Sequence, residues 1–137
     1  MTQACDLAKA KGARRTLPLP VAGAYHSPLM ASAQPKLQAE LARIGLLAPT
    51  VPVISNVTAQ PHQGPDDIRG RLIEQITASV RWEESIRFLL GQGFTRFIEL
   101  GPGTALTGFM KRIDRTAQIL NVADLASLEA TSKVLSN

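Results

Sequence analysis

The stretch that decides the fold is RFIELGPGTALTGFMKRI, at residues 96–113. Its first five residues predict a β-strand, and the glycines at residues 101–103 predict a sharp turn. The turn leads into a helix whose apolar side carries Phe109 and Ile113, and residues 118–122 predict another strand. A strand, a helix and a second strand in this order form a parallel β-α-β unit, so the sequence predicts an α/β fold.

The rest of the chain adds helices and one more strand around this unit. From residue 49 onward strands alternate with helices, as in parallel sheets, whose ligands bind beyond the carboxyl ends of the strands. The other expected elements are a helix at 3–11, an extended segment at 16–21, a helix at 27–44 that bends at Pro35, a strand at 52–57, a loop at 60–65, helices beginning at Pro65 and Trp82, and a final helix capped by Asp124.

The composition is that of a folded domain. The chain has 137 residues, of which 45% are apolar and 19% charged, whereas disordered chains are poor in apolar residues and highly charged. No apolar run reaches the roughly 20 residues that a membrane-spanning helix needs. The single cysteine, Cys5, forms no internal disulfide, and the N-terminus has no secretory signal, so we expect a cytoplasmic protein.

The chain is basic, with 15 lysines and arginines against 11 acidic residues and a net charge of +4. Nucleic-acid-binding proteins cluster their cations and add aromatic side chains that stack on bases. Here the tight clusters are Arg14-Arg15 and Lys111-Arg112, and aromatic residues make up 4% of the chain. We therefore expect an acidic partner or a phosphate-bearing ligand, and neither a nucleic acid nor a membrane.

His26 is the residue best placed for catalysis. It follows a glycine-containing connection and precedes a helix start, so the turn can present its ring to a cleft as a general base. A structural role remains open, because a lone histidine in such a place is commonly structural. His62 lies in the polar loop QPHQG and is expected to be exposed and without a role. These two histidines and Cys5 give no recognisable metal-ligand spacing and no activated thiol.

The turn GPGT at residues 101–104 has two interpretations. Glycines at a helix start leave N–H groups that can bind an anion, but the Gly-Lys-Ser/Thr ending of a phosphate-binding loop is missing. We favour a structural turn that needs glycine for its backbone angles. A histidine base also calls for a serine, and none of the chain's serines lies in a Gly-x-Ser-x-Gly motif. On its own residues the chain shows one half of a catalytic pair.

Four sequence blocks resemble the malonyl-CoA:acyl carrier protein transacylases, in the order of that family and with compatible spacing. The first block closely resembles the segment around the family's active-site histidine. The blocks are LPLPVAGAYHSPLM at 17–30, VPVISNV at 51–57, QI at 75–76 with VRW at 80–82, and ELGPGTALTG at 99–108 followed by Lys111-Arg112. Together they cover nearly the whole chain.

The resemblance implies an acyltransferase of fatty acid biosynthesis, which moves a malonyl group from coenzyme A to the phosphopantetheine thiol of acyl carrier protein. It implies that His26 is the base, which takes the proton of a serine nucleophile and later activates the incoming thiol. It also implies that the backbone carbonyl of Gln75 orients the imidazole and that Tyr25 lines the acyl pocket in a form similar to the malonyl type. The implied partners are malonyl-CoA and acyl carrier protein, and no cofactor is implied beyond the coenzyme A thioester as substrate.

By the same resemblance, the fold is the C-terminal part of an acyltransferase with an α/β-hydrolase-like parallel sheet. Residues 1–22 then correspond to the last helix and strand of a ferredoxin-like small subdomain, and residues 23–137 to the C-terminal part of the large subdomain. The sequence departs from the family at Thr104, where lysine is common, and at Ser79, where proline is usual. The family's serine motif, oxyanion-hole glutamine and carboxylate-binding arginine precede the histidine segment, and this sequence does not contain them.

We therefore expect a fragment of a transacylase that is inactive alone. One alternative is a non-catalytic module that binds acyl carrier protein, or a complementary chain that carries the serine. An unrelated carbohydrate- or nucleotide-binding α/β domain is the other alternative. A parallel sheet divided within a domain leaves apolar edges uncovered, so poor solubility or self-association is expected.

Overall fold

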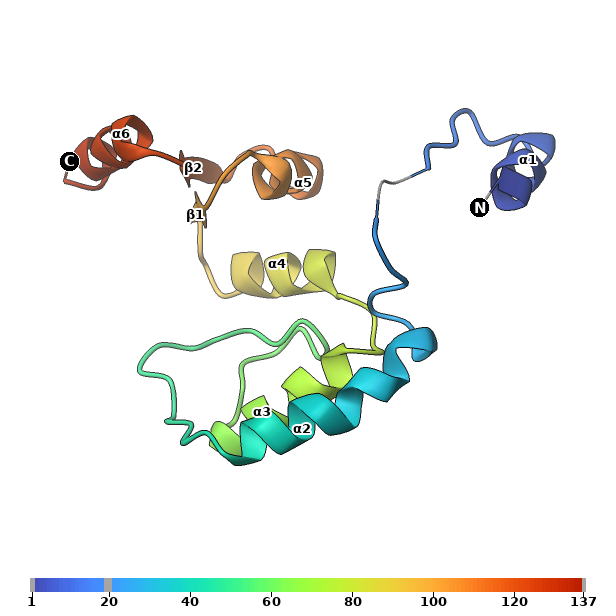
Figure 1. Ribbon diagram of the computed structural model, residues 1–137. Helices are drawn as coiled ribbons and strands as arrows, with labels where there is room; N and C mark the ends of the chain where they lie inside the picture. Colours follow the sequence, from blue (N-terminus) through green and yellow to red (C-terminus); the bar gives the residue numbers. More distant parts are fainter. Residues whose placement is uncertain (1, 19–20, 137) are drawn as a thin grey trace.

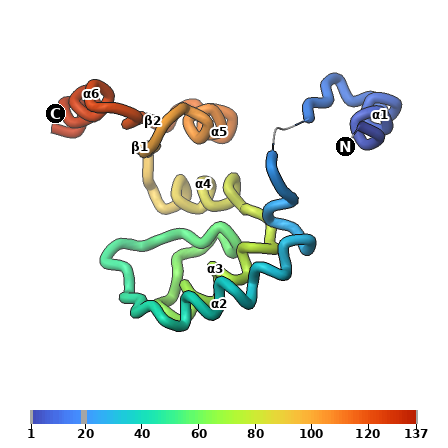
Figure 2. Tube along the Cα trace, viewed as in Figure 1, coloured from blue at the N-terminus to red at the C-terminus, as the bar shows by residue number. Residues whose placement is uncertain are grey.

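The structure is a computed structural model that describes residues 2–18 and 21–136. In chain order its elements are α1 (Thr2–Ala10), the 3-10 helix η1 (Pro28–Ala33), α2 (Gln34–Ala42), α3 (Pro65–Gln75), α4 (Trp82–Gly91), β1 (Arg96–Leu100), α5 (Ala105–Ile113), β2 (Gln118–Val122) and α6 (Leu125–Leu135). Figure 1 shows α2 and α3 side by side, with α4 between this helix pair and the strands. The helix α1 stands apart from the other elements in this view (Figure 2).

The two strands form a parallel sheet connected by α5, as the sequence predicts. The register pairs Arg96 with Gln118 and Leu100 with Val122. The helix α6 packs against β2, and α5 contacts both β2 and α4 (Figure 1). Both strands have the predicted bounds. The predicted parallel β-α-β unit, and with it the α/β class, is therefore confirmed.

The helix ends lie where the capping residues predict them. Asp124 precedes α6 and accepts a hydrogen bond from the N–H of Ser127 at 2.8 Å, while the Ser127 hydroxyl in turn accepts from the N–H of Asp124 at 2.9 Å. Gly12 follows α1 and Gly93 follows α4, each with a φ of +89°, a left-handed conformation that glycine adopts without strain. Local sequence therefore sets these boundaries.

The helix expected at residues 27–44 is divided at the predicted bend. Residues Pro28–Ala33 form the 3-10 helix η1, and α2 begins at Gln34 with Pro35 in its first turn. Proline has no N–H to continue the α-helical bonding across this point, so the bend becomes a change of helix type. Leu41 in α2 is buried, whereas Leu29 in η1 is exposed.

The strand expected at residues 52–57 is wrong. The structure has a single antiparallel bridge there, between Ile54 and Pro61. The N–H of Ser55 donates to the carbonyl of Gln60, and the N–H of His62 donates to the carbonyl of Val53, both at 2.9 Å. The pairing ends after these two bonds, because the chain reverses within residues 56–59.

The extended segment before His26 forms no strand in its described part. Residues 13–18 and 21–22 have no regular strand structure, and residues 19 and 20 lie outside the described residues. Two prolines in this segment, at positions 18 and 20, remove backbone donors that a strand would use. The strand that the resemblance implies within residues 1–22 is therefore not observed in the part that the structure describes.

Few side chains are buried. Among the described residues, the buried hydrophobic side chains are Leu41, Ala59, Ile86 and Met110. The accessible surface is 10163 Å², whereas a compact monomer of 14.7 kDa exposes about 6,900 Å². The chain thus leaves a large apolar surface uncovered, which is the physical condition for the expected self-association. None of the described helices is long and apolar enough to cross a membrane.

Candidate functional site

His26 lies in a strained position at the entrance to η1. Its φ is +58°, a value that few residues other than glycine adopt, and the residue is exposed. The next residue, Ser27, is extended and its hydroxyl donates to the carbonyl of Ala24 at 2.7 Å, which closes a tight turn. Left-handed residues of this kind persist where the surrounding structure holds them and are frequent at functional sites.

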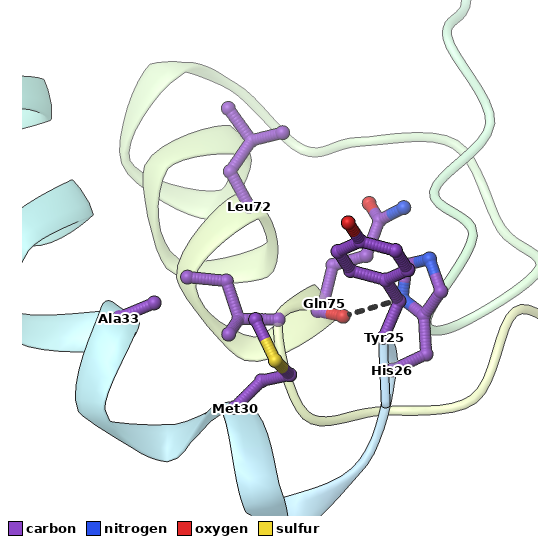
Figure 3. Close-up of a pocket in the computed structure, with 7 residues that line it drawn as sticks. Tyr25, His26, Met30, Ala33, Leu72 and Gln75 are labelled. Carbon is purple, nitrogen blue, oxygen red and sulfur yellow. Dashed lines mark hydrogen bonds between the residues drawn. The ribbon is translucent and has the colours of Figure 1, made fainter. Parts of the chain in front are cut away.

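The imidazole of His26 is fixed by the end of a distant helix. Its Nδ1 atom lies 2.8 Å from the backbone carbonyl oxygen of Gln75, the last residue of α3 (Figure 3). The final carbonyls of a helix have no partner within the helix, so this oxygen is free to accept. Because a carbonyl only accepts, Nδ1 carries the hydrogen, and in the neutral ring Nε2 then has the free lone pair. This is the tautomer that a general base at Nε2 requires.

Gln34 ties α2 to the end of α3, which supplies the carbonyl of this contact. Its side-chain Nε2 donates to the carbonyl of Ile73 at 3.2 Å and to the hydroxyl of Thr77 at 3.3 Å. These bonds join the first residue of α2 to Ile73 in the last turn of α3 and to Thr77 just after that helix, on either side of Gln75. No local signal marks this positioning residue in the sequence, because one glutamine before a proline matches no motif.

A small pocket opens beside the His26 ring. It has a volume of about 370 Å³, and Figure 3 shows the His26 and Tyr25 rings on one side and Met30 and Leu72 on the other. The full lining is Tyr25, His26, Met30, Ala33, Leu72, Gln75 and Ile76. The structure therefore brings together the three site residues that the sequence singled out, and most of the remaining wall is apolar.

The Gly101–Gly103 turn is structural, as favoured from the sequence. Gly101 and Gly103 have φ values of +129° and +87°, where a side chain would be strained. The Glu99 carboxylate accepts from the N–H groups of Leu106 and Thr107 at 3.0 and 2.9 Å, and from the Thr107 hydroxyl. Hydrogen bonding by Thr107, above all its hydroxyl, lowers the pKa of Glu99. The first N–H groups of α5 are thus occupied by the chain's own carboxylate.

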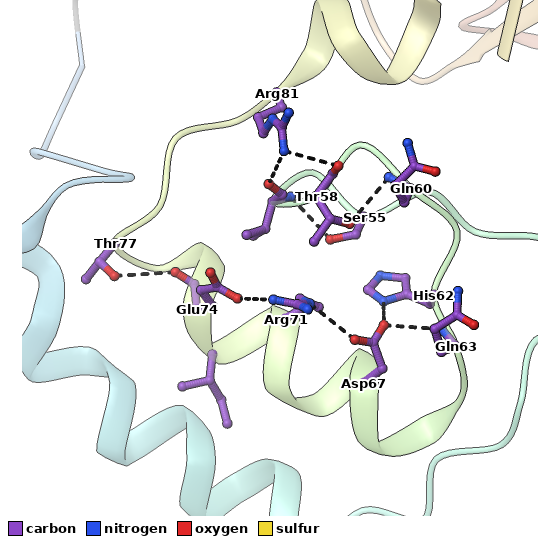
Figure 4. A network of polar contacts seen from close by, with 12 residues as sticks. Ser55, Thr58, Gln60, His62, Gln63, Asp67, Arg71, Glu74, Thr77 and Arg81 are labelled. Carbon is purple, nitrogen blue, oxygen red and sulfur yellow. Dashed lines mark hydrogen bonds and ion pairs between the residues drawn. The ribbon is translucent and has the colours of Figure 1, made fainter. Parts of the chain in front are cut away.

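His62 is buried and paired, which corrects the prediction of an exposed, idle loop residue. Its side chain is only 8% exposed, and Nδ1 lies 2.9 Å from Oδ2 of Asp67 (Figure 4). The hydrogen bond from His62, followed by that from the N–H of Gln63, lowers the pKa of Asp67. Asp67 also pairs with Arg71 at 3.2 Å. The His62–Asp67 contact holds the loop against the first turn of α3. The polar sequence of the loop does not indicate that His62 has a partner.

The structure does not bring Cys5 or a set of metal ligands to the His26 site in the part of the chain that it describes. Cys5 lies in α1, away from the His26 site in sequence, and is partly exposed. In the part of the chain that the structure describes, no group of three histidine, cysteine or acidic side chains could hold a metal ion. The chemistry that the arrangement offers is proton transfer at Nε2 of His26.

Comparison with known proteins gives consistent matches. The chain is 42% identical over 132 residues to a malonyl CoA-acyl carrier protein transacylase of Bacillus subtilis, covering 96% of this chain and 42% of that protein. It is 45% identical over 115 residues to the enzyme of that name from Escherichia coli K12, covering 82% of this chain and 37% of that protein. No model of a protein family matches the chain.

Solved structures give the same result. The malonyl CoA-acyl carrier protein transacylase of Coxiella burnetii superposes with a TM-score of 0.91 at 38% identity, over 99% of this chain and 43% of that one. The acyl-carrier-protein S-malonyltransferase of Burkholderia pseudomallei gives 0.89 at 39% identity, over 96% and 43%. The chain spans about two fifths of the length of the curated relatives it matches. By sequence and by structure, the chain is therefore related to the C-terminal part of the malonyl CoA-acyl carrier protein transacylases.

Proposed function

We propose that this chain supplies the histidine half of a malonyl-transfer site, with His26 as the general base. The proposed donor is malonyl-CoA, and the proposed acceptor is the phosphopantetheine thiol of acyl carrier protein. The observation that carries the proposal is the 2.8 Å contact between His26 Nδ1 and the Gln75 carbonyl, which leaves Nε2 free to take a proton. The names of the relatives supply the substrate class.

The first half-reaction forms an acyl-enzyme on a serine that the remainder of the transacylase fold would supply. Nε2 of His26 takes the hydroxyl proton as the serine oxygen attacks the thioester carbonyl. When the carbon–sulfur bond breaks, the proton passes from His26 to the coenzyme A sulfur, which leaves as a thiol. The malonyl group is then an ester of the serine, and His26 is neutral again.

The second half-reaction uses the same proton path with the other thiol. His26 takes the proton of the phosphopantetheine thiol, and the resulting thiolate attacks the malonyl ester. The serine oxygen leaves and recovers its proton from His26. In both halves the Gln75 carbonyl accepts the hydrogen bond from Nδ1 and stabilises the imidazolium that forms, in the role that a carboxylate has in a catalytic triad.

A backbone carbonyl suits an anionic substrate better than a carboxylate would. Malonyl carries its own negative charge, and a second full charge near the base would repel it. In this proposal Tyr25, beside His26, contacts the acyl group, and the apolar wall around Met30 and Leu72 excludes water from it. The similarity of Tyr25 and its neighbours to the malonyl-type sequence favours malonyl as the acyl group.

In this proposal the chain contains parts of two subdomains of the transacylase. Residues 1–22 belong to the small subdomain and residues 23–137 to the large one, which places His26 just after the boundary. The net charge of +4 suits an acidic acyl carrier protein as partner. The reaction needs no cofactor besides the thioester substrate, and its substrates are those of a cytoplasmic pathway.

The proposal is tested in a chimera, in which this chain replaces the matched 132 residues of the Bacillus subtilis relative. We expect the chimera to transfer malonyl from malonyl-CoA to acyl carrier protein. The variant His26→Ala should fold, as judged by circular dichroism, and lose about 10²–10⁴-fold in kcat/KM. Added imidazole should restore part of the loss, which it would not do for a structural histidine. A folded His26→Ala chimera with the parent's rate would contradict the proposal.

A further inference from the structure

We propose that Arg81 positions the His26 base, because it ends α3 before the chain itself can use the Gln75 carbonyl. Arg81 holds the segment after α3 on the turn at residues 56–58, which keeps the N–H of Ser79 away from that carbonyl. The consequence for catalysis rests on the proposed function. Arg81 is a positioning residue, since it does not line the pocket beside His26 and acts through Gln75.

The α-helical bonding of α3 stops directly before Gln75. The carbonyl of Glu74 accepts from the N–H of Ala78, four residues further on, at 3.0 Å. In an α-helix each N–H donates to the carbonyl four residues earlier, so the next bond of the series would join Ser79 to Gln75. In the described part of the chain that bond is not made, and the Gln75 carbonyl accepts from His26 instead.

Ser79 therefore carries the donor that competes for this carbonyl. Its N–H donates to none of the residues that the structure describes, and the residue is exposed. An extension of α3 by one residue would give this N–H an acceptor. The Gln75 carbonyl would then be shared or lost, and in either case the bond that fixes the His26 ring is weakened. A ring without that bond no longer keeps its hydrogen on Nδ1 alone.

Arg81 opposes this extension through contacts with the turn at residues 56–58. Its backbone N–H donates to the carbonyl of Asn56 at 2.8 Å, whereas in a continuing helix it would donate to the fourth residue before it. Its guanidinium donates to the carbonyl of Thr58 at 3.2 Å and to that of Val57 at 3.5 Å (Figure 4). The chain has therefore left the helical path when it reaches Arg81.

The turn that Arg81 contacts is itself held in place. Ser55 is buried, its carbonyl accepts from the N–H of Ala59 at 2.8 Å, and its hydroxyl accepts from the N–H of Val57 at 3.2 Å. Ala59 is also buried, with a φ of +57°, a conformation that persists where the surrounding structure enforces it. On its other side, Arg81 pairs with Glu84 in the first turn of α4. The Arg81 side chain is thus fixed between two anchored elements.

The test places Arg81→Met in the chimera, a change that keeps the aliphatic stem and removes the guanidinium donors. We expect kcat to fall about threefold to tenfold with KM unchanged, because the base is misoriented while the substrate contacts remain. Arg87→Met is the matched control, since Arg87 lies on the same helix and its side chain bonds to Glu83. A folded Arg81→Met chimera with the parent's kcat would overturn the inference.

A second substitution identifies the competing donor. Added to Arg81→Met, Ser79→Pro removes the N–H that would take the Gln75 carbonyl, and we expect it to restore most of the lost kcat. Ser79→Ala in the same background keeps the N–H and should restore nothing. Recovery with both substitutions, or with neither, would overturn competition by Ser79.

Two further measurements do not depend on catalysis. Nitrogen NMR at alkaline pH shows which ring atom of His26 carries the hydrogen. We expect Nδ1 in the parent chimera, both nitrogens in Arg81→Met, and Nδ1 again after Ser79→Pro. In the parent, the amide of Ser79 should exchange about tenfold faster than the bonded amide of Ala78. Equal protection of these two amides would overturn the inference even if the Arg81 variant did not fold.

The role of Arg81 and the proposed function fail separately. A chimera that shows these tautomers but transfers no malonyl would refute the proposed function alone. A chimera that needs His26 for transfer, but whose tautomer and kcat are unchanged in Arg81→Met, would refute the role of Arg81 alone.

Discussion

The Nδ1 atom of His26 lies 2.8 Å from the backbone carbonyl oxygen of Gln75, 49 residues further along the chain. The contact joins a strained turn to the end of α3. The last carbonyls of a helix have no hydrogen-bond partner within the helix, so this one is free to accept. It fixes the tautomer of the ring and leaves Nε2 free for proton transfer. The proposed chemistry of the chain depends on this single relationship.

Loss of the Gln34 side chain should loosen that contact. In the chimera, Gln34→Ala removes two hydrogen bonds between α2 and α3, and we expect a loss of about 1–2 kcal/mol in the free energy of unfolding. We also expect a lower kcat with little change in KM, because the base is misplaced while the substrate contacts remain. Gln38→Ala, on the exposed side of α2, is the control for urea denaturation and kinetics. Equal effects of the two variants would show that Gln34 has no positioning role.

The turn after β1 should not tolerate a side chain. Gly101→Ala places a Cβ on a residue with a φ of +129°, which should cost about 1–3 kcal/mol of stability. Gly70→Ala, within α3 and with open space around its Cα, should instead stabilise the chimera by about 0.5–1 kcal/mol. Thermal unfolding measures both. The same sign for the two substitutions would contradict this account of the turn.

Asp67 should contribute to stability in a pH-dependent way. The His62 hydrogen bond, first among its causes, lowers the pKa of Asp67 in the folded chain. A carboxyl with a depressed folded pKa stabilises the fold above its ordinary pKa of about 3.9, and this contribution is lost as the pH falls through the lower folded value. Asp67→Asn should therefore lower the melting temperature at neutral pH. It should also weaken the fall of the melting temperature as the pH is lowered.

Asp66 provides the matched comparison for Asp67. It is the preceding residue and fully exposed, and its ion pair with Arg69 lies on the surface. Asp66→Asn should leave both the melting temperature at neutral pH and its fall at low pH close to those of the parent, because exposed pairs contribute little. If the dependence of the melting temperature on pH changed equally in the two variants, the His62–Asp67 pair would not be the cause.

The basic charge of the chain predicts salt-sensitive binding of an acidic carrier. Acyl carrier protein should bind the chimera more tightly at about 0.02 M than at about 0.3 M salt. Titration calorimetry measures the difference. Binding that is unaffected by salt would remove charge as the basis of recognition, and no binding at either salt would remove the carrier-binding alternative.

Elements with a strong local signal could be predicted from the sequence. The strand–turn–helix–strand pattern of residues 96–122 predicts β1, α5 and β2. Asp124 predicts the start of α6. Around His26, the glycine turn and the following proline indicate an exposed ring before a helix. In each case residues close in sequence determine the conformation.

Tertiary partners could not be predicted in the same way. The partner of His62 is the carboxylate of Asp67, and only the folded loop brings the two together. The strand expected at residues 52–57 fails because its apolar pattern specifies no neighbour, and Ile54 meets only Pro61. Gln34 and the Glu99 cap of α5 likewise depend on contacts between elements. The role of Gln75 came from family resemblance, since no local pattern marks a backbone carbonyl.

In the proposed malonyl transfer, His26 takes the proton of a serine. The most direct test of this step is the single-turnover rate at which the chimera's serine is malonylated by malonyl-CoA, followed by rapid-quench mass spectrometry. We predict a rate about 10²–10⁴-fold lower in His26→Ala than in the parent chimera. Equal single-turnover rates in two folded proteins would contradict the claim.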